Sequence, residues 1–134
     1  MSEKAFVMIK PDGVRRGLIG EIVSRFEKKG LSVIRAELKS IEREIAETHY
    51  GHLRQKPFFE ELVAYITSGP VLALIVEGRN AVQCSRSLIG PTNPAEAPPG
   101  TIRGDFGLDV EENIIHGSDS VDNARREIDL FFYK

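Results

Sequence analysis

The chain has 134 residues, of which 41% are hydrophobic and 28% are charged, with a formal net charge of −2. This length and composition are typical of one folded domain with its own hydrophobic core, so we expect residues 1–134 to form a single domain. The slightly acidic balance excludes a protein that coats nucleic acid through excess positive charge. We therefore expect no obligatory nucleic-acid partner.

Cysteine content and hydropathy indicate the compartment. Cys84 is the one cysteine, which excludes an internal disulfide and is typical of a reducing environment. The longest apolar run, residues 71–76, is far shorter than the roughly 20 residues that a membrane-spanning helix needs. The first residues carry no pattern of a secretory signal. We expect a cytoplasmic protein with no membrane partner.

The first half of the chain predicts strands and helices in alternation. An apolar run at residues 5–9 predicts a strand, and the PDG sequence after it predicts a turn. Apolar residues at helical spacing from Ile19, with Gly30 beyond them, predict a helix with a C-terminal stop. Apolar and charged residues alternate over 34–38, which predicts a strand with its charged face in water. Residues 42–50 predict a short helix.

The second half continues the alternation. Residues 59–66 and 80–88 predict helices, and the apolar run 71–76 between them predicts a central strand. Residues 113–117 predict a short strand, and helical spacing resumes at Val121.

A long segment interrupts this order at residues 90–107, which hold four of the seven prolines and four of the twelve glycines. A loop of this length in a small domain is usually functional or disordered. The order of elements predicts an α+β fold with a ferredoxin-like βαββαβ core, in which helices cover one face of a four-stranded antiparallel sheet.

The sequence lacks several common phosphate and metal motifs. It contains no GxxxxGK[ST] loop, no GxGxxG after a strand, no paired CxxC and no HExxH. His49 and His52 lie three residues apart on a predicted helix, a spacing that a metal site can use. Because no third ligand is near them in the sequence, we interpret both as solvated helix residues.

A few side chains outside the predicted core are candidates for ligand contact. His116 and Lys10 each end a predicted strand; His116 either projects into a cleft or is satisfied by a backbone carbonyl. Phe58 lies off the apolar stripe of its helix, so it is either a hydrophobic staple or a stacking surface for a flat ligand. Arg86 and Arg103, together with Lys10, suit an anion pocket. These residues alone do not select a reaction.

Five segments resemble the nucleoside diphosphate kinase family, in its order and spacing and over essentially the whole chain. They are IKPDGV at 9–14, KPFF at 56–59, GPTNP at 90–94, GTIRGDF at 100–106 and NIIHGSDS at 113–120. The last segment is the most specific of the five. The resemblance implies the ferredoxin-like fold and the exchange ATP + NDP ⇌ ADP + NTP through a phosphohistidine at His116.

The resemblance also implies a role for each matching residue. Arg86, Thr92 and Arg103 match phosphate-binding residues, Lys10 and Asn113 match residues that hold the ribose hydroxyls, and Tyr50 matches a hydroxyl near the γ-phosphate. Phe58, Leu62 and Val110 correspond to a stacking slot for the base, and Ser118 and Glu127 to groups that orient the imidazole. Mg²⁺ is expected to arrive on the nucleotide, with Asp119 near it through water and no direct protein ligand. Family members are homo-oligomers, tetramers or hexamers.

Two other classes of function compete with this interpretation. One is a catalytically silent nucleotide-sensing module on the same fold, which the intact set of Lys10, His116 and two arginines disfavours. The other is a nucleic-acid binder that uses exposed aromatics on a four-stranded sheet. The acidic charge and the 7% aromatic content argue against it.

Overall fold

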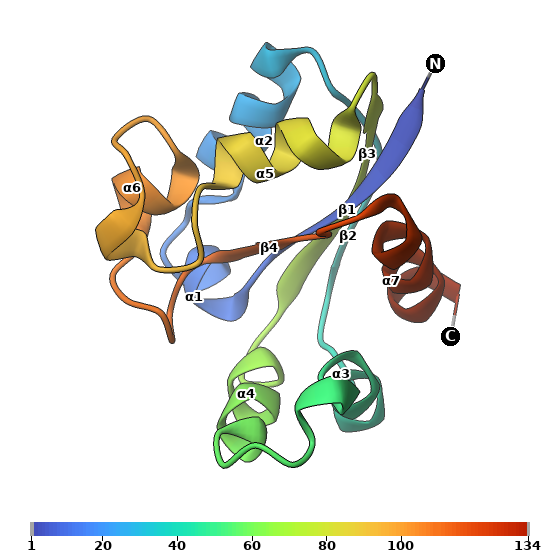
Figure 1. The fold of residues 1–134 in the computed structure, drawn as a ribbon, viewed down its shortest axis with the longest axis vertical. Coiled ribbons are helices and arrows are strands. Elements are labelled where there is room, and N and C mark those ends of the chain that lie inside the picture. Colours follow the sequence, from blue (N-terminus) through green and yellow to red (C-terminus); the bar gives the residue numbers. More distant parts are fainter. Residues whose placement is uncertain (1, 134) are drawn as a thin grey trace.

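A four-stranded antiparallel sheet organises the chain, and helices cover both of its faces (Figure 1). The structure is a computed structural model that describes residues 2–133. Its strands are β1 Glu3–Ile9, β2 Ser32–Lys39, β3 Val71–Gly78 and β4 Ile115–Gly117. Its α-helices are α1 Pro11–Arg15, α2 Ile19–Lys29, α3 Arg43–His49, α4 Phe59–Ile66, α5 Ala81–Ile89, α6 Ile102–Phe106 and α7 Val121–Tyr133, with short 3₁₀ turns η1 Gly51–Leu53 and η2 Pro94–Glu96.

The strand order β2-β3-β1-β4 confirms the predicted fold class. Strands β1 and β3 lie in the middle of the sheet, as the apolar run 71–76 predicts. The short strand β4 pairs with the C-terminal half of β1, and Met8 lies opposite His116 in that register. The beginning of β4 therefore lies beside the end of β1, next to Lys10.

The prediction that helices cover only one face of the sheet is wrong. Along β1, Ala5, Val7 and Ile9 belong to one buried cluster with residues of α2 and α5. Phe6 and Met8 belong to a second cluster, with residues of α3, α4 and α7. A strand buried on both faces reads as a continuous apolar run rather than an alternating one. The continuous apolar run at residues 5–9 is the sequence pattern of a strand buried on both faces. Because both faces are covered, the sheet offers no open platform for stacking nucleic-acid bases.

Strand β2 lies at the edge of the sheet, and the face that it exposes to water is the opposite of the one predicted. Ile34 and Leu38 are 46% and 60% exposed. The charged side chains on the other face are half-buried against the end of α7, where the Arg35 guanidinium lies 4.7 Å and the Lys39 ammonium 5.0 Å from the ring of Phe132. Cation–π contacts and carbon stems let basic side chains cover an aromatic surface.

Two predicted loops contain helix. The PDG sequence predicted as a turn is the beginning of α1, because proline is well suited to the first position of a helix. The segment 90–107 contains η2 and α6, and α6 is capped by Thr101, whose hydroxyl accepts a hydrogen bond from the amide of Gly104 at 2.9 Å. Over residues 2–133, no helix combines the length and apolar character that crossing a bilayer requires.

Candidate active site

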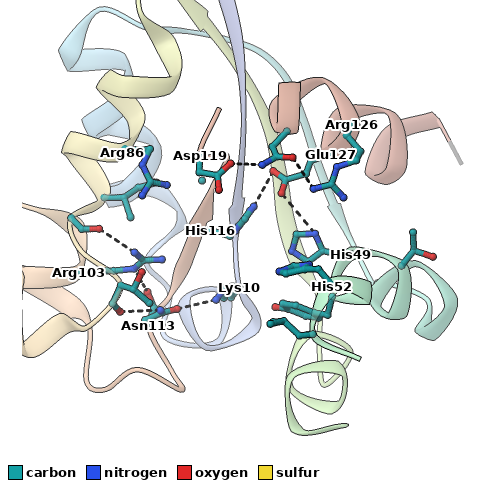
Figure 2. Close-up of a pocket in the computed structure, with 18 residues that line it drawn as sticks. Lys10, His49, His52, Arg86, Arg103, Asn113, His116, Asp119, Arg126 and Glu127 are labelled. Carbon is teal, nitrogen blue, oxygen red and sulfur yellow. Dashed lines mark hydrogen bonds and ion pairs between the residues drawn. The ribbon is translucent and has the colours of Figure 1, made fainter. Parts of the chain in front are cut away.

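A cavity of about 600 Å³ opens where the ends of β1 and β4 meet α3, α5 and α7. Its volume lies in the range of small-molecule sites. Most residues that the sequence nominated line it (Figure 2). These are Lys10, Tyr50, Arg86, Thr92, Arg103, Asn113, His116, Asp119 and Glu127.

His116 lies on β4 with about a quarter of its side chain exposed to the cavity. Its Nε2 lies 3.0 Å from Oε1 of Glu127. A carboxylate accepts hydrogen bonds, so this contact places the ring proton on Nε2 and leaves a lone pair on Nδ1. Of the two environments that the sequence left open for His116, the structure shows the cleft, with a carboxylate rather than a backbone carbonyl as partner.

Glu127 is held from two sides in the interior. It is 5% exposed, and the hydroxyl of Ser118 donates a 2.7 Å hydrogen bond to the same Oε1. Ser118 also accepts a hydrogen bond from the amide of Phe6, which fastens this group to β1. Burial by itself raises the pKa of Glu127, but the hydrogen bonds from His116 and Ser118 outweigh it and hold the pKa below its ordinary value. The carboxylate is therefore charged at neutral pH.

His49 belongs to this site, and its interpretation as a solvated helix residue is wrong. It is 5% exposed, and its ring meets that of His116 edge-on, with 5.0 Å between centroids and an interplanar angle of 87°. Burial, and then the nearby His116, lower the pKa of His49 to about 3, so it is neutral. A usable signal existed in the sequence: His49 follows Ile45 and Ala46 at helical spacing, on the buried face of α3. His52, in contrast, is exposed.

Lys10, Arg86 and Arg103 are three of the cations that line the cavity. Within residues 2–133, none of Lys10, Arg86 and Arg103 forms an ion pair. Burial and repulsion from Arg103 lower the pKa of Lys10 to about 8. Burial and repulsion from Arg86 lower that of Arg103 to about 10. Mutually repelling charges in one partly buried cavity make a strong site for a multivalent anion.

Arg103 is positioned by the backbone of the segments around it. Its guanidinium donates hydrogen bonds to the carbonyl oxygens of Gly90, Asn113 and Ile115 at 3.1, 3.3 and 2.5 Å. These bonds tie the beginning of the long segment to the entry of β4. The fork geometry of arginine allows this bridging while leaving the charge at the cavity wall.

An unusual backbone conformation at Ile114 sets the neighbouring side chains. Ile114 has φ of 75°, which is strained for a β-branched residue and is found mainly where structure and function require it. Its amide donates to Oδ2 of the buried Asp12 at 3.1 Å, and its carbonyl accepts from the amide of Lys10. The Asn113 side chain then accepts a 2.9 Å hydrogen bond from the Lys10 ammonium. Asp12, which the sequence did not nominate, is the residue that holds this turn.

The close approach of α1 to this turn also requires Gly13. A Cβ at this position would lie 2.8 Å from a methyl carbon of Ile9 and 2.9 Å from one of Ile114. Gly13 of the PDG sequence therefore lets helix α1 pack against the strained turn at Ile114. This turn places Asn113 beside Lys10.

Three residues of the expected base slot lie outside the cavity lining. Phe58 and Val110 are 43% and 52% exposed, and Leu62 is half-buried on α4. Their role in stacking stays a prediction. Tyr50 and Asp119 line the cavity, and their roles toward the γ-phosphate and Mg²⁺ stay predictions. The pKa of Tyr50 is raised to about 12 by burial and by Glu127, so it keeps its phenol proton. Asp119 accepts a hydrogen bond from the side-chain amide of Asn123 at the cavity rim.

Comparison with known proteins identifies the class to which this site belongs. A family model described as nucleoside diphosphate kinase matches residues 3–134. The nucleoside diphosphate kinases of Archaeoglobus fulgidus and Macrococcus caseolyticus are 61% and 62% identical to the chain over 130 residues, covering 97% of it and 86% and 88% of the relatives. The structure of a halophilic nucleoside diphosphate kinase from Halobacterium salinarum in complex with CDP matches with a TM-score of 0.96 at 51% identity, covering all of this chain and 90% of that one. The chain therefore belongs to the nucleoside diphosphate kinase family.

Proposed function

We propose that His116 carries a phosphoryl group between nucleotides. In the first half-reaction, the Nδ1 lone pair attacks the γ-phosphorus of a nucleoside triphosphate, a P–N bond forms, and the bond to the β,γ-bridging oxygen breaks to release the diphosphate. The second half-reaction is the reverse, with another nucleoside diphosphate as acceptor. The observation that carries this proposal is the hydrogen bond between His116 Nε2 and the charged Glu127, because it fixes the tautomer whose Nδ1 is a nucleophile.

The choice of a nitrogen nucleophile suits an exchange reaction. A phosphoramidate is an energetic linkage, so its phosphoryl group can return to a diphosphate, whereas a serine phosphoester cannot readily remake a triphosphate. Phosphorylation at Nδ1 makes the ring more positive while Nε2 keeps its proton. The buried carboxylate of Glu127, fastened by Ser118, stabilises that charge.

The three cations supply the rest of the catalysis. A loose phosphoryl-transfer transition state leaves the protein chiefly with positioning and charge stabilisation. We assign Arg86, Thr92 and Arg103 to the phosphates and Asn113 with Lys10 to the ribose hydroxyls. Lys10 also lies where it can neutralise the transferring group, and Tyr50 offers a hydroxyl near the γ-phosphate. The CDP complex of the Halobacterium relative supports a nucleoside diphosphate as substrate.

Magnesium fits this cavity as a companion of the nucleotide rather than as a resident ion. Hard cations prefer oxygen ligands, and Mg²⁺ usually keeps several waters and binds substrate phosphates. Of the two carboxylates in the lining, Glu127 is buried and Asp119 is exposed at the rim, so a hydrated Mg²⁺ on the nucleotide would contact Asp119 through water. Bound in this way, Mg²⁺ would offset phosphate charge.

We propose that Phe58, Leu62 and Val110 form the slot for the base. The exposed faces of Phe58 and Val110 support it. Stacking on an aromatic ring tolerates every base, because each base has a π-face. We therefore expect broad specificity among nucleoside diphosphates.

We also propose that the chain, folded as one domain in the cytoplasm, assembles as a homo-tetramer or homo-hexamer. Exposed apolar side chains on the open sheet edge at β2, Ile34 and Leu38, support burial against another copy. Sedimentation equilibrium measures the mass directly, and a monomer at micromolar concentration would contradict this assembly.

The phosphohistidine can be tested by labelling. Protein incubated with γ-labelled ATP should acquire phosphate that is labile in acid and stable in base, and His116→Ala should acquire none while still binding ADP. Acid-stable label, or label on the alanine variant, would refute the assignment. A silent sensing module would instead bind nucleotide and acquire no label at all.

A further inference from the structure

The inner wall of the cavity gathers three metal-binding side chains from three separate elements. His49 comes from α3, His116 from β4 and Glu127 from α7, and one ligand atom of each lies within 4.8 Å of the others. The Glu127 carboxylate reaches both rings, with Oε1 3.0 Å from Nε2 of His116 and Oε2 3.9 Å from Nδ1 of His49. In Figure 2, Arg86 and Arg103 lie on one side of His116, and His49 and Glu127 lie on the other. Arg86 and Arg103 therefore lie apart from the cluster, whereas Lys10 and Arg126 lie near enough to His49 to lower its pKa.

His49 supplies the observation that points to a ligand. Its Nδ1 is buried and has no hydrogen-bond partner within the described residues, and the residue as a whole is 5% exposed. Buried polar atoms nearly always have a partner, and an exception in a native fold calls for an explanation such as an absent water or ion. The 3.9 Å separation from Glu127 is too long for a hydrogen bond.

We propose that His49, His116 and Glu127 form a binding site for a divalent transition-metal ion such as Zn²⁺, and that the bound ion switches off phosphoryl transfer. Two imidazole nitrogens and one carboxylate oxygen are a donor set that Zn²⁺ takes in proteins, with a fourth position open to water or a ligand. Imidazole favours Zn²⁺, Cu²⁺ and Ni²⁺ over Mg²⁺, which prefers oxygen. The site therefore discriminates against the magnesium that accompanies the nucleotide.

The geometry needs only small side-chain movements to close around an ion. With metal–ligand distances of about 2.0–2.2 Å, ligands in a tetrahedral site lie roughly 3.3 Å apart. The present spread of up to 4.8 Å must therefore contract. Ser118 holds Glu127 from behind, so rotation of the two rings toward the carboxylate supplies the movement.

The proposed inhibition follows from the proposed function and from the tautomer of His116. A metal ion can bind Nε2 only in the tautomer in which that nitrogen has lost its proton, so the proton of the neutral ring then resides on Nδ1. The ring stays neutral with one proton, because water accepts the proton that leaves Nε2 and supplies another to Nδ1. Nδ1 then has no lone pair for the γ-phosphorus, while Arg86, Arg103 and Lys10 remain able to bind phosphates. The ion stops phosphorylation without displacing the nucleotide.

Metal binding can be measured without any nucleotide. Chelator-treated protein is titrated with Co²⁺, whose visible absorption is strong in tetrahedral sites, and the bound Co²⁺ is then displaced with Zn²⁺. We expect one ion per chain and at least a tenfold loss of affinity in His49→Gln and in His116→Gln. His52→Gln is the matched control, since His52 is an exposed histidine at the rim of the same cavity, and its affinity should equal that of the unmodified protein. Equal affinities for all four proteins would overturn the site.

A second measurement tests the inhibition. Phosphoenzyme formation from γ-labelled ATP and Mg²⁺ is followed with and without Zn²⁺, each variant being compared with itself. Zn²⁺ should reduce the labelling rate at least tenfold in the unmodified protein and in His52→Gln, leave ADP affinity unchanged, and have little effect on His49→Gln. Equal inhibition of His49→Gln would overturn the proposed switch. If the metal-free protein acquires no label, the proposed function is refuted instead, and the Co²⁺ titration still decides the site.

Discussion

Glu127→Gln tests how the buried carboxylate serves the reaction. The substitution removes one negative charge and nearly preserves the size of the side chain. The carboxylate oxygen accepts hydrogen bonds from His116 at 3.0 Å and from Ser118 at 2.7 Å. A hydrogen bond to a charged group contributes about 1.5–3 kcal/mol, and the ring becomes more positive as it is phosphorylated. Loss of one such bond at the transition state should slow phosphorylation roughly 10- to 160-fold.

The direction of this effect has a second cause. A glutamine can turn its N–H₂ group toward Nε2 of His116, and the ring proton then moves to Nδ1 and blocks the nucleophile. Replacement of a carboxylate by an amide beside a catalytic histidine is severe for this reason. Both causes lower the rate of phosphorylation, and neither touches the groups that hold the phosphates, so ADP affinity should change little.

The assay is a single-turnover labelling with γ-labelled ATP, stopped by rapid alkaline quench. The chain contains no tryptophan, so chemical quench replaces the usual fluorescence signal. Asp122→Asn is the matched control, since it removes an exposed carboxylate from the same helix α7, outside the cavity lining. A Glu127→Gln protein that is phosphorylated as fast as Asp122→Asn would refute the role assigned to the carboxylate.

Two further predictions concern nucleotide binding and stability. Phe58→Ala should weaken ADP, GDP, CDP and UDP alike by about 1–3 kcal/mol in calorimetric titrations, because stacking does not distinguish bases; a loss confined to one base would show edge readout instead. Lys10→Met should stabilise the free protein at pH 7 against urea, because the folded-state pKa of Lys10 is lowered to about 8 from an ordinary value of 10.5. The unfolded chain binds more protons between these values, so the unmodified protein gains stability as pH rises from 8 to 10.5, and the advantage of Lys10→Met should shrink over that window. A Lys10→Met protein less stable than the unmodified one at pH 7 would contradict this electrostatic picture.

Local pattern predicted the elements well where one periodicity dominates. The helix that begins at Ile19 and ends before Gly30 lies where the spacing places it, because Gly30 has φ of 105° and stops the helix. Strand β2 shows the limit of such patterns. Alternation at residues 34–38 locates the strand, but the choice of face depends on the aromatic end of α7, which follows nearly a hundred residues later in the chain.

In the site, too, local sequence pattern identified some residues, whereas others depend on contacts between distant parts of the chain. From position alone, His116 had two environments open to it, of which the backbone-carbonyl one was favoured, and the resemblance of five segments to a known family reversed that preference. His49 was misread because its partners were sought nearby in the sequence, whereas His116 and Glu127 reach it only through the fold. The strained turn at Ile114 was invisible for a similar reason: the Asp12 carboxylate that stabilises it comes from the opposite end of the chain.

The central claim is that one ring nitrogen of His116 carries the phosphoryl group. Phosphorylated protein labelled with ¹⁵N-histidine allows the ³¹P nucleus to be correlated with the nitrogen to which it is bonded. We expect one phosphorus signal, coupled to Nδ1 of His116, and a proton on Nε2 of the same ring. Phosphorus coupled to Nε2, bonded to another side chain, or absent after incubation with ATP would contradict the account.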